Sequence, residues 1–270
     1  MDDIEFEAPN RLQKVVKSIL NPIANYTPAF LMKTILKFRC ETAELNWKNP
    51  GGWNTMLMYY ENRSKYLSDV MMTKCSSIGM ALRNRRKIVA SVISDCIDRH
   101  RRDNPHVVCL GAGPGVIIND ALKACSKPKA TATLVDLNAD SFEYGRQLAI
   151  KNNLEHRMNW INADVRNIDA WLTNKNIDIV KMIGICEYLT DEKVKNIISC
   201  VSSAMPIGSK IVVNSISDIH GNDRFFRNVL GINLRYRTTN DMEKFLIGFG
   251  HFDIHTEPTG IFSVVVGTKR

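Results

Sequence analysis

The sequence lacks the features that mark membrane proteins, secreted proteins and proteins stabilised by disulfides or structural metal ions. No apolar run approaches the ~20 residues that cross a bilayer, and the start of the chain is acidic where a secretory signal is basic. The seven cysteines are scattered without paired spacing, which indicates neither a disulfide framework nor a zinc site. We therefore expect a soluble protein of the reducing cytoplasm, with no metal and no membrane partner.

The 270 residues include 44% hydrophobic residues, enough to bury one full core. Residues 10–104 have helical periodicity, with breaks at Asn21-Pro22 and at 49–52, whereas the later part alternates apolar strands with helices. The sequence thus predicts an N-terminal helical cap over residues 1–104 and an α/β domain over residues 105–270.

The most informative stretch is the apolar run that begins at Val107 and ends in the loop Gly111-Ala112-Gly113-Pro114-Gly115. Glycines tolerate the tight turn and let the backbone approach a ligand closely. A second apolar run ends in Asp136, and a carboxylate at that strand end can accept both hydroxyls of a ribose. Together these patterns predict a nucleoside pocket.

The details of the loop argue against a dinucleotide. In the dinucleotide fingerprint the third glycine comes one place later than Gly115, where this chain has Val116. Pro114 also removes one amide donor, which matters more for a pyrophosphate than for an amino-acid tail. A merely structural strand-to-helix turn remains the alternative interpretation of this loop.

Two further strands follow in the same order. Residues 158–165 form an apolar run that contains Asp164, and residues 177–183 lead into Gly184-Ile185-Cys186-Glu187-Tyr188. The C-terminal part adds a turn and strand at 206–214 and a last pair of apolar runs at 251–255 and 261–266. Over roughly residues 80–270, this order resembles the class I S-adenosylmethionine-dependent methyltransferases.

The resemblance implies a fold, a cofactor and a set of contacts. The fold is a doubly wound, mostly parallel, Rossmann-like sheet of seven strands, with the last strand inserted antiparallel. The cofactor is S-adenosylmethionine, with the glycine loop at its methionine part, Asp136 at the ribose and Asp164 at the adenine amine. The cofactor-binding residues implied in this way are Gly111, Gly113, Gly115, Asp136, Leu137, Asp164, Val165 and Gly184.

The segment after the fourth strand normally carries the substrate chemistry in this family. The Asp/Asn-Pro-Pro-aromatic motif of enzymes that methylate exocyclic amines of bases or glutamine is absent, and Cys186 is better explained as an inert buried thiol than as a nucleophile. Glu187 and Tyr188 are candidate catalytic residues that could bind a substrate amine or orient the sulfonium, although they could equally cap the next helix.

Two other groups are candidates for the acceptor side. His220 lies in the polar insertion 215–227 and is the histidine best placed to act as a base, unless it is simply exposed. Tyr59, Tyr60 and Arg63 belong to the cap. As a lid they would place aromatic faces near the sulfonium and a guanidinium near the cofactor carboxylate; as core they would only pack.

The formal net charge of +8 concentrates at 83–87 and 99–102, near the two ends of a helix predicted over Met80–Arg101. We interpret these clusters as a solvated charged face rather than as an RNA-binding or anion-binding surface, because no aromatic residues are interleaved with the basic ones. A nucleic-acid partner is therefore disfavoured.

More narrowly, the stretches 79–85 and 234–250 resemble a bacterial branch of small-molecule methyltransferases, which is also similar to azetidine-2-carboxylate synthases. The first function hypothesis is methyl transfer to a small metabolite by direct displacement at the sulfonium. The second is a cyclase or aminobutyryl-transfer enzyme that releases methylthioadenosine. An RNA methyltransferase or a binding module is less favoured. No motif indicates the acceptor or the oligomeric state.

Overall fold

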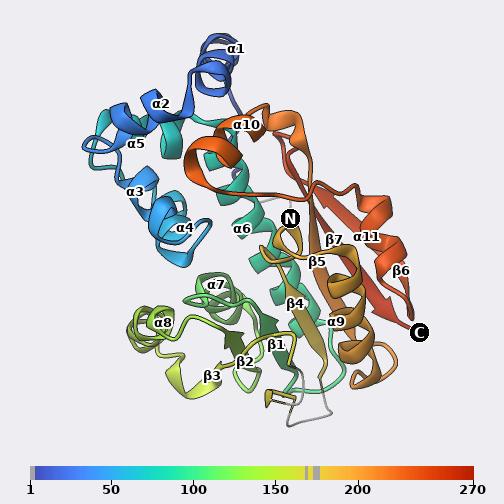
Figure 1. Ribbon diagram of the computed structural model, residues 1–270. Helices are drawn as coiled ribbons and strands as arrows, with labels where there is room; N and C mark the ends of the chain where they lie inside the picture. Colours follow the sequence, from blue (N-terminus) through green and yellow to red (C-terminus); the bar gives the residue numbers. More distant parts are fainter. Residues whose placement is uncertain (1–3, 168–169, 173–176) are drawn as a thin grey trace.

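The computed structural model describes residues 4–167, 170–172 and 177–270, and its central element is a seven-stranded sheet (Figure 1). The strand order is β3-β2-β1-β4-β5-β7-β6, and β7 is the strand that runs antiparallel to both of its neighbours. The strands are β1 (His106–Leu110), β2 (Thr131–Asp136), β3 (Met158–Asn162), β4 (Ile179–Met182), β5 (Lys210–Ile216), β6 (Phe249–Thr256) and β7 (Phe262–Lys269). The predicted seven-stranded fold is confirmed.

The strand order places the functional segments together. The central strand β1 pairs in parallel with β2 on one side and with β4 on the other. After β1 the chain adds β2 and β3 toward one edge of the sheet and then crosses back to add β4 and β5 toward the other edge, which makes the position between β1 and β4 a topological switch point. Ligands of open α/β sheets bind at the carboxyl ends of the strands at such a switch point. The glycine loop follows β1 and the segment 184–188 follows β4, so both lie at this edge.

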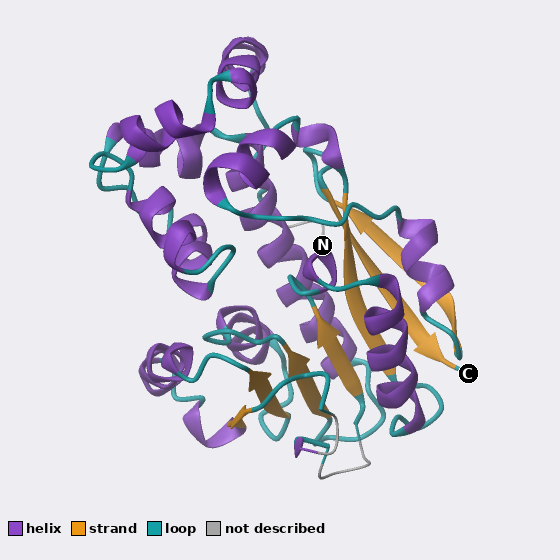
Figure 2. Ribbon diagram, in the orientation of Figure 1, coloured by secondary structure: helices purple, strands orange, loops and turns teal. Residues whose placement is uncertain are grey.

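Helices cover both faces of the sheet (Figure 2). Buried residues of α6, α7 and α8 share one hydrophobic cluster with β1, β2 and β4, whereas α9 and α11 pack on the opposite face. The longer helices are α1 (Arg11–Tyr26), α2 (Ala29–Leu36), α3 (Glu41–Lys48), α4 (Trp53–Tyr60), α6 (Ser77–Asp98), α7 (Val116–Ala124), α8 (Asp140–Lys151), α9 (Asp191–Ser203) and α11 (Thr239–Phe245). Within the described ranges, none of the helices is long and apolar enough to cross a membrane.

Short helical segments fill the connections between these elements. They are α5 (Leu67–Val70), the π-helical turns η1 (Met71–Cys75) and η6 (Phe226–Leu230), α10 (Asp223–Phe225), and the 3₁₀ turns η2 (Glu155–Arg157), η4 (Cys186–Tyr188) and η5 (Asp218–His220). Within residues 10–104, which the sequence predicts to be helical, a further break separates α4 from α5, because residues 61–66 form a turn around Asn62, whose φ is +55°.

Helix α6 joins the N-terminal region to the sheet. Its N-cap residue Ser76 accepts a hydrogen bond from the backbone N–H of Gly79, and its last three turns contribute Ile88, Ile93 and Ile97 to the sheet core. The helix predicted over Met80–Arg101 is α6, and in the structure it begins and ends three residues earlier, at Ser77 and Asp98. Helix α6 lies before the predicted division at residue 104 but packs against the sheet that follows it. The division into a cap and a catalytic domain stays a prediction.

The cap helices α2, α3 and α4 form a third hydrophobic cluster with the end of the sheet. Tyr59 is 5% exposed and packs in this cluster with Ile216 of β5 and Phe262 of β7. The insertion between β5 and α11 completes the cluster through Phe226. The N-terminal region is thus held to the sheet domain by an apolar cluster.

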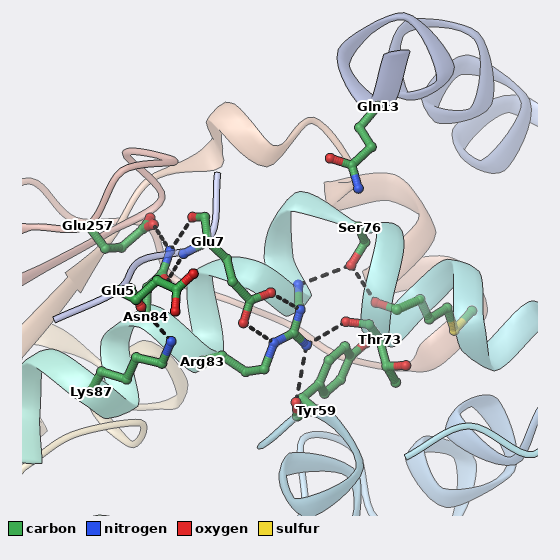
Figure 3. Close-up of polar contacts among 12 residues, drawn as sticks. Glu5, Glu7, Gln13, Tyr59, Thr73, Ser76, Arg83, Asn84, Lys87 and Glu257 are labelled. Atoms are coloured by element: carbon green, nitrogen blue, oxygen red, sulfur yellow. Dashed lines mark hydrogen bonds and ion pairs between the residues drawn. The ribbon is translucent and has the colours of Figure 1, made fainter. Parts of the chain in front are cut away.

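A buried arginine fixes the N-terminal segment and the cap onto α6 (Figure 3). Arg83 donates to both carboxylate oxygens of Glu7, at 2.7 and 2.6 Å, and to the backbone carbonyls of Tyr59 and Thr73. The neighbouring Asn84 bonds the backbone of Glu7 in both directions. The arginine holds the pKa of Glu7 below its usual value through this hydrogen bonding.

This arrangement corrects the interpretation of the first basic cluster as a solvated face. Arg83, Asn84 and Arg85 are 6%, 0% and 3% exposed, because each finds polar partners inside the molecule that a helical-wheel pattern cannot reveal. The second cluster, 99–102, borders a separate cleft at the amino ends of β4 and β5, where Arg102 pairs with Asp178.

We expect Arg83→Met to lower the free energy of unfolding by about 2–4 kcal/mol, because it leaves buried carbonyls and the Glu7 carboxylate without their donor. The matched control is Arg86→Met, since Arg86 lies on the same helix but pairs with Asp120 at the surface. Its loss should cost no more than about 1 kcal/mol. Equal midpoints of the two variants in urea unfolding would contradict the role given to Arg83.

Candidate active site

A cavity of about 440 Å³ lies at the carboxyl ends of β1 and β4, beneath the cap helix α4. Nine residues singled out from the sequence line it: Tyr59, Tyr60, Gly111, Gly113, Asp136, Leu137, Gly184, Glu187 and Tyr188. The other five, Arg63, Gly115, Asp164, Val165 and His220, are not among its lining residues. The cavity therefore brings together segments that are far apart in the chain but meet at the switch point.

The glycine loop and Asp136 form one end of this cavity. The carboxylate of Asp136 accepts hydrogen bonds from the backbone N–H groups of Gly113 at 2.7 Å and of Asn138 at 2.9 Å. One bond to each oxygen fixes the orientation of the carboxylate and leaves further lone pairs to accept hydroxyl groups. Gly113 has a φ of +52°, and a Cβ there would meet only Trp53, at 3.6 Å, so this face of the loop is open.

Gly115 has a different role from the other loop glycines. It is the N-cap of α7 with a φ of +71°, and a Cβ at this position would come within 2.3 Å of the Leu134 side chain. The tight packing of α7 against β2 requires this glycine. Its contribution to the cavity is to hold the loop in shape.

A buried ion pair forms the opposite wall. Arg85 extends from α6 with its guanidinium 4.3 Å from the ring centroid of Phe262 and 3.4 Å from the Glu187 carboxylate. The two side chains are 3% and 5% exposed. Burial lowers the pKa of Arg85, but the neighbouring Tyr60 hydroxyl and Glu187 carboxylate more than offset this effect, so that the pKa is raised.

The ion pair is incompletely bonded. Within the part of the chain that the structure describes, Arg85 Nε and Glu187 Oε2 have no hydrogen-bond partner. Leaving such a buried polar group unpaired costs about 1–3 kcal/mol, and more when it is charged. The same holds for the hydroxyl of Thr55, which also lines the cavity. These groups are suited to receive polar groups of a ligand.

A second buried cation lies in the cavity wall. Lys181 of β4 is 4% exposed, and the ion pairs found among the described residues do not include it. Its neighbours across the sheet are Cys109 and Val212, which offer no charge. The signal in the sequence was a lysine inside the apolar run 177–183, and sequence reasoning missed it, as it missed Arg85.

The rest of the cavity is mostly apolar, although Asn49 and Asn138 also line it. Apolar lining residues come from α4, α6, the end of β5, the connection between β5 and α11, and β7: Trp53, Met56, Leu57, Ile78, Leu82, Ile216, Phe226, Ile232, Leu234 and Phe262. The ring of Trp53 also lies 6.2 Å from that of Tyr144 on α8, whose hydroxyl donates to Glu61. The cavity thus has a polar end at the glycine loop and an apolar end under the cap.

His220 does not reach this cavity. It is completely buried, its Nδ1 accepts from the backbone N–H of Asn222 at 3.1 Å, and its Nε2 lies 3.0 Å from the hydroxyl of Tyr236. That hydroxyl donates to Asp223, so the neutral tautomer with a proton on Nε2 completes the network. Burial lowers the pKa of His220 to about 4. The alternative expectation of an exposed histidine is wrong, because the ring is buried within the insertion, and His220 is not among the residues that line the cavity.

The remaining predicted residues lie outside the cavity lining. Asp164 accepts hydrogen bonds from Arg166, which hold the pKa of its carboxyl below the usual value. The carbonyl of Val165 accepts from the indole of Trp171. Arg63 is exposed, at the end of α4, because the turn at 61–66 directs it away from the ligand end of the cavity.

Comparison with known proteins agrees with this geometry. Residues 107–208 match the family described as a methyltransferase domain, and no curated protein matches the sequence. A possible exported protein from Bordetella parapertussis is similar in structure, with a TM-score of 0.66 and 16% identity over 77% of this chain and 74% of that chain. At such identities the likeness concerns the fold.

Two further structures are methyltransferases. The S-adenosylmethionine-dependent methyltransferase SibL has a TM-score of 0.53 with 14% identity, over 85% of this chain and 70% of its own. An O-methyltransferase family 2 protein from Planctomyces limnophilus, in complex with apigenin, has a TM-score of 0.51 with 12% identity, over 76% and 70%.

The matched domain includes the glycine loop, Asp136 and the segment after β4, which are the parts that form the polar end of the cavity. The open Gly113, the free lone pairs of Asp136 and the buried cation Lys181, which forms no ion pair with the described residues, fit a nucleoside that carries an amino-acid tail. Residues 107–208 therefore match the methyltransferase-domain family, within the fold of the class I S-adenosylmethionine-dependent methyltransferases that the sequence predicted, and this match implies S-adenosylmethionine as the cofactor.

Proposed function

We propose that the protein transfers the methyl group of S-adenosylmethionine to a small metabolite. The observation that carries this proposal is the cavity itself, which continues from the glycine loop into an apolar compartment under the cap. Its volume of about 440 Å³ falls in the range of roughly 300–1,000 Å³ that small-molecule sites occupy. The relative solved with apigenin also holds a small aromatic molecule.

The polar end of the cavity supplies the cofactor contacts. Asp136 would accept both ribose hydroxyls, and the backbone at Gly111 and Gly113 would lie along the methionine part. Leu137 and Gly184 border the same space. Asp164 and Val165 follow β3 beside this end, and we retain Asp164 as the proposed partner of the adenine amine.

Lys181 and Arg85 are better placed than Arg63 to hold the cofactor carboxylate. Both are buried cations in the cavity wall, Arg85 Nε has no partner among the described residues, and a carboxylate between the two side chains could pair with both. Arg63 lies at the surface, so the sequence-based assignment of that role to it is not retained. The rings of Tyr59, Tyr60 and Tyr188 border the same cavity and could face the sulfonium.

Glu187 is the proposed catalytic residue on the acceptor side. Its Oε2 atom has no partner among the described residues, and its other oxygen lies 3.4 Å from Arg85. A carboxylate in this state can accept the proton, or orient the N–H or O–H group, of an acceptor that attacks the methyl carbon in line. The protein then contributes mainly positioning and exclusion of water.

The decisive experiment separates methyl transfer from ring closure of the cofactor tail. The purified protein is incubated with S-adenosylmethionine, first alone and then with a panel of small aromatic and amine acceptors, and the nucleoside product is identified by mass spectrometry. We expect S-adenosylhomocysteine, formed only when an acceptor is present. Methylthioadenosine formed without any acceptor would contradict methyl transfer and establish the cyclase hypothesis.

Asp136→Ala should weaken S-adenosylhomocysteine binding at least tenfold, since each charge-assisted hydrogen bond lost costs about 1.5–3 kcal/mol. The control is Asp140→Ala, because Asp140 is an exposed carboxylate at the start of α8. Isothermal titration calorimetry on folded protein measures both. The same affinity in the two variants would remove Asp136 from the site.

Lys181→Met should weaken the binding of S-adenosylhomocysteine at least tenfold and leave methylthioadenosine binding within about twofold, because only the first ligand carries a carboxylate. Lys210→Met is the matched control, since Lys210 lies on the adjacent strand outside the cavity and bonds Thr268. An equal loss of affinity for both nucleosides would show that Lys181 supports the fold of the pocket rather than the carboxylate.

A further inference from the structure

Helix α1 exposes an apolar face that the rest of the chain does not cover. The helix spans Arg11–Tyr26, and none of its residues is buried. Its most exposed large apolar side chains are Leu12 at 71%, Val15 at 56%, Ile19 at 58%, Ile23 at 53% and Tyr26 at 70%. Surface helices of globular proteins normally turn such side chains toward the core.

The helix contacts the protein body through its polar side instead. Lys17, Asn21 and Asn25, spaced four residues apart, donate to the backbone carbonyls of Ile219, His220 and Gly221. Residues four apart share one face of a helix, and the exposed apolar residues fall on the opposite face. The hydrophobic stripe of α1 therefore faces away from the rest of the protein. The helix itself lies at the top of Figure 1.

The next helix and its C-terminal turn also expose large apolar side chains. Phe30, Leu31, Ile35 and Phe38 are 73%, 44%, 56% and 74% exposed. With the five residues of α1 they make nine of the ten exposed large apolar side chains in the segment Asn10–Arg39, and the tenth is Leu20 at 36%. Monomeric proteins rarely leave an apolar patch of more than a few hundred Å² open to water.

We propose that this surface is the interface with a second copy of the chain. If each of the side chains offers roughly 100 Å², the surface amounts to about 900 Å² per chain, close to the ~800 Å² per partner of a standard protein interface. A pair of such surfaces thus buries enough area for a stable dimer.

The spacing and the charges both favour a copy of the same chain. Leu12, Val15, Ile19 and Tyr26 follow the i, i+3, i+7, i+14 spacing of a helix-pairing seam, with Ile23 beside them. No charged residue interrupts the stripe. Lys14 and Lys17 lie on the side toward the body, and Lys17 already bonds Ile219, so two seams can meet without bringing cations together.

A lipid surface fits less well. Helices that lie on anionic membranes carry basic residues flanking the apolar face, from where they reach the headgroups. Here two of the three basic residues of α1 are on the opposite side.

Helix α1 is also linked to the cavity. Asn25 accepts a hydrogen bond from the backbone N–H of Phe225, and the next residue, Phe226, lines the cavity.

Sedimentation velocity of the full chain tests the proposal. We expect a species of twice the 30.6 kDa chain mass for the wild type, and a monomer for the variant Ile19→Glu/Ile23→Glu. The matched control is Ile207→Glu/Ile247→Glu, which adds the same charge at two isoleucines that are 81% and 70% exposed elsewhere. It should remain a dimer. Circular dichroism confirms that each variant is folded, and the milder Ile19→Gln/Ile23→Gln replaces the first if it is not.

Three results would overturn the proposal. A monomeric wild type at about 50 µM, well above the range of stable dimers, is the first. Dissociation of the control to the same extent as the α1 variant is the second. The third is a monomer that co-sediments with vesicles of phosphatidylserine and phosphatidylcholine through Ile19 and Ile23, which would assign the surface to a membrane.

Discussion

The buried pairing of Arg85 with Glu187 connects the three parts of the molecule that form the cavity. Arg85 comes from α6, Glu187 from the turn after β4, and the ring under the guanidinium is Phe262 of β7. Phe262 is itself positioned by Glu257, whose carboxylate accepts from the backbone N–H groups of residues 261 and 262. A buried ion pair costs free energy unless its polar atoms are all hydrogen-bonded. Because Arg85 Nε and Glu187 Oε2 have no partner among the described residues, a ligand that bonds them would stabilise the pair.

The structure thereby explains how one cavity can serve two ligands. Its sheet end is polar and shaped by backbone, with Gly113 open and Asp136 oriented by two amide donors. Its cap end is apolar and is formed by residues of α4 and of the insertion before α11. Between them stand Lys181, Arg85 and Glu187, and in the proposed function Lys181 and Arg85 recognise the carboxylate of the cofactor while Glu187 binds the acceptor. Displacement at a sulfonium needs little more from a protein than this arrangement.

The parts of the fold and site that could be predicted are those encoded locally. The glycine loop, Asp136 and the strand-end segment 184–188 follow from spacing along the chain, and the strand order follows once the family resemblance is made. The residues that could not be predicted depend on distant partners. In the sequence Arg85 is one of several basic residues in a row, and its burial depends on Phe262 and Glu187, which are distant in the chain. For His220 the error is the opposite one: the polar sequence around it predicts an exposed ring, but the ring is buried and hydrogen-bonded to Tyr236 and Asn222.

The central claim is that the cavity at the carboxyl ends of β1 and β4 holds the nucleoside at one end and keeps the apolar end for an acceptor. A crystal structure of the protein with S-adenosylhomocysteine tests it directly. The account predicts both ribose hydroxyls within hydrogen-bond distance of Asp136, the carboxylate at Lys181 or Arg85, and the compartment under Trp53 and Phe226 left free beside the sulfur. A nucleoside that fills the apolar compartment, or that contacts neither Asp136 nor Lys181, would contradict it.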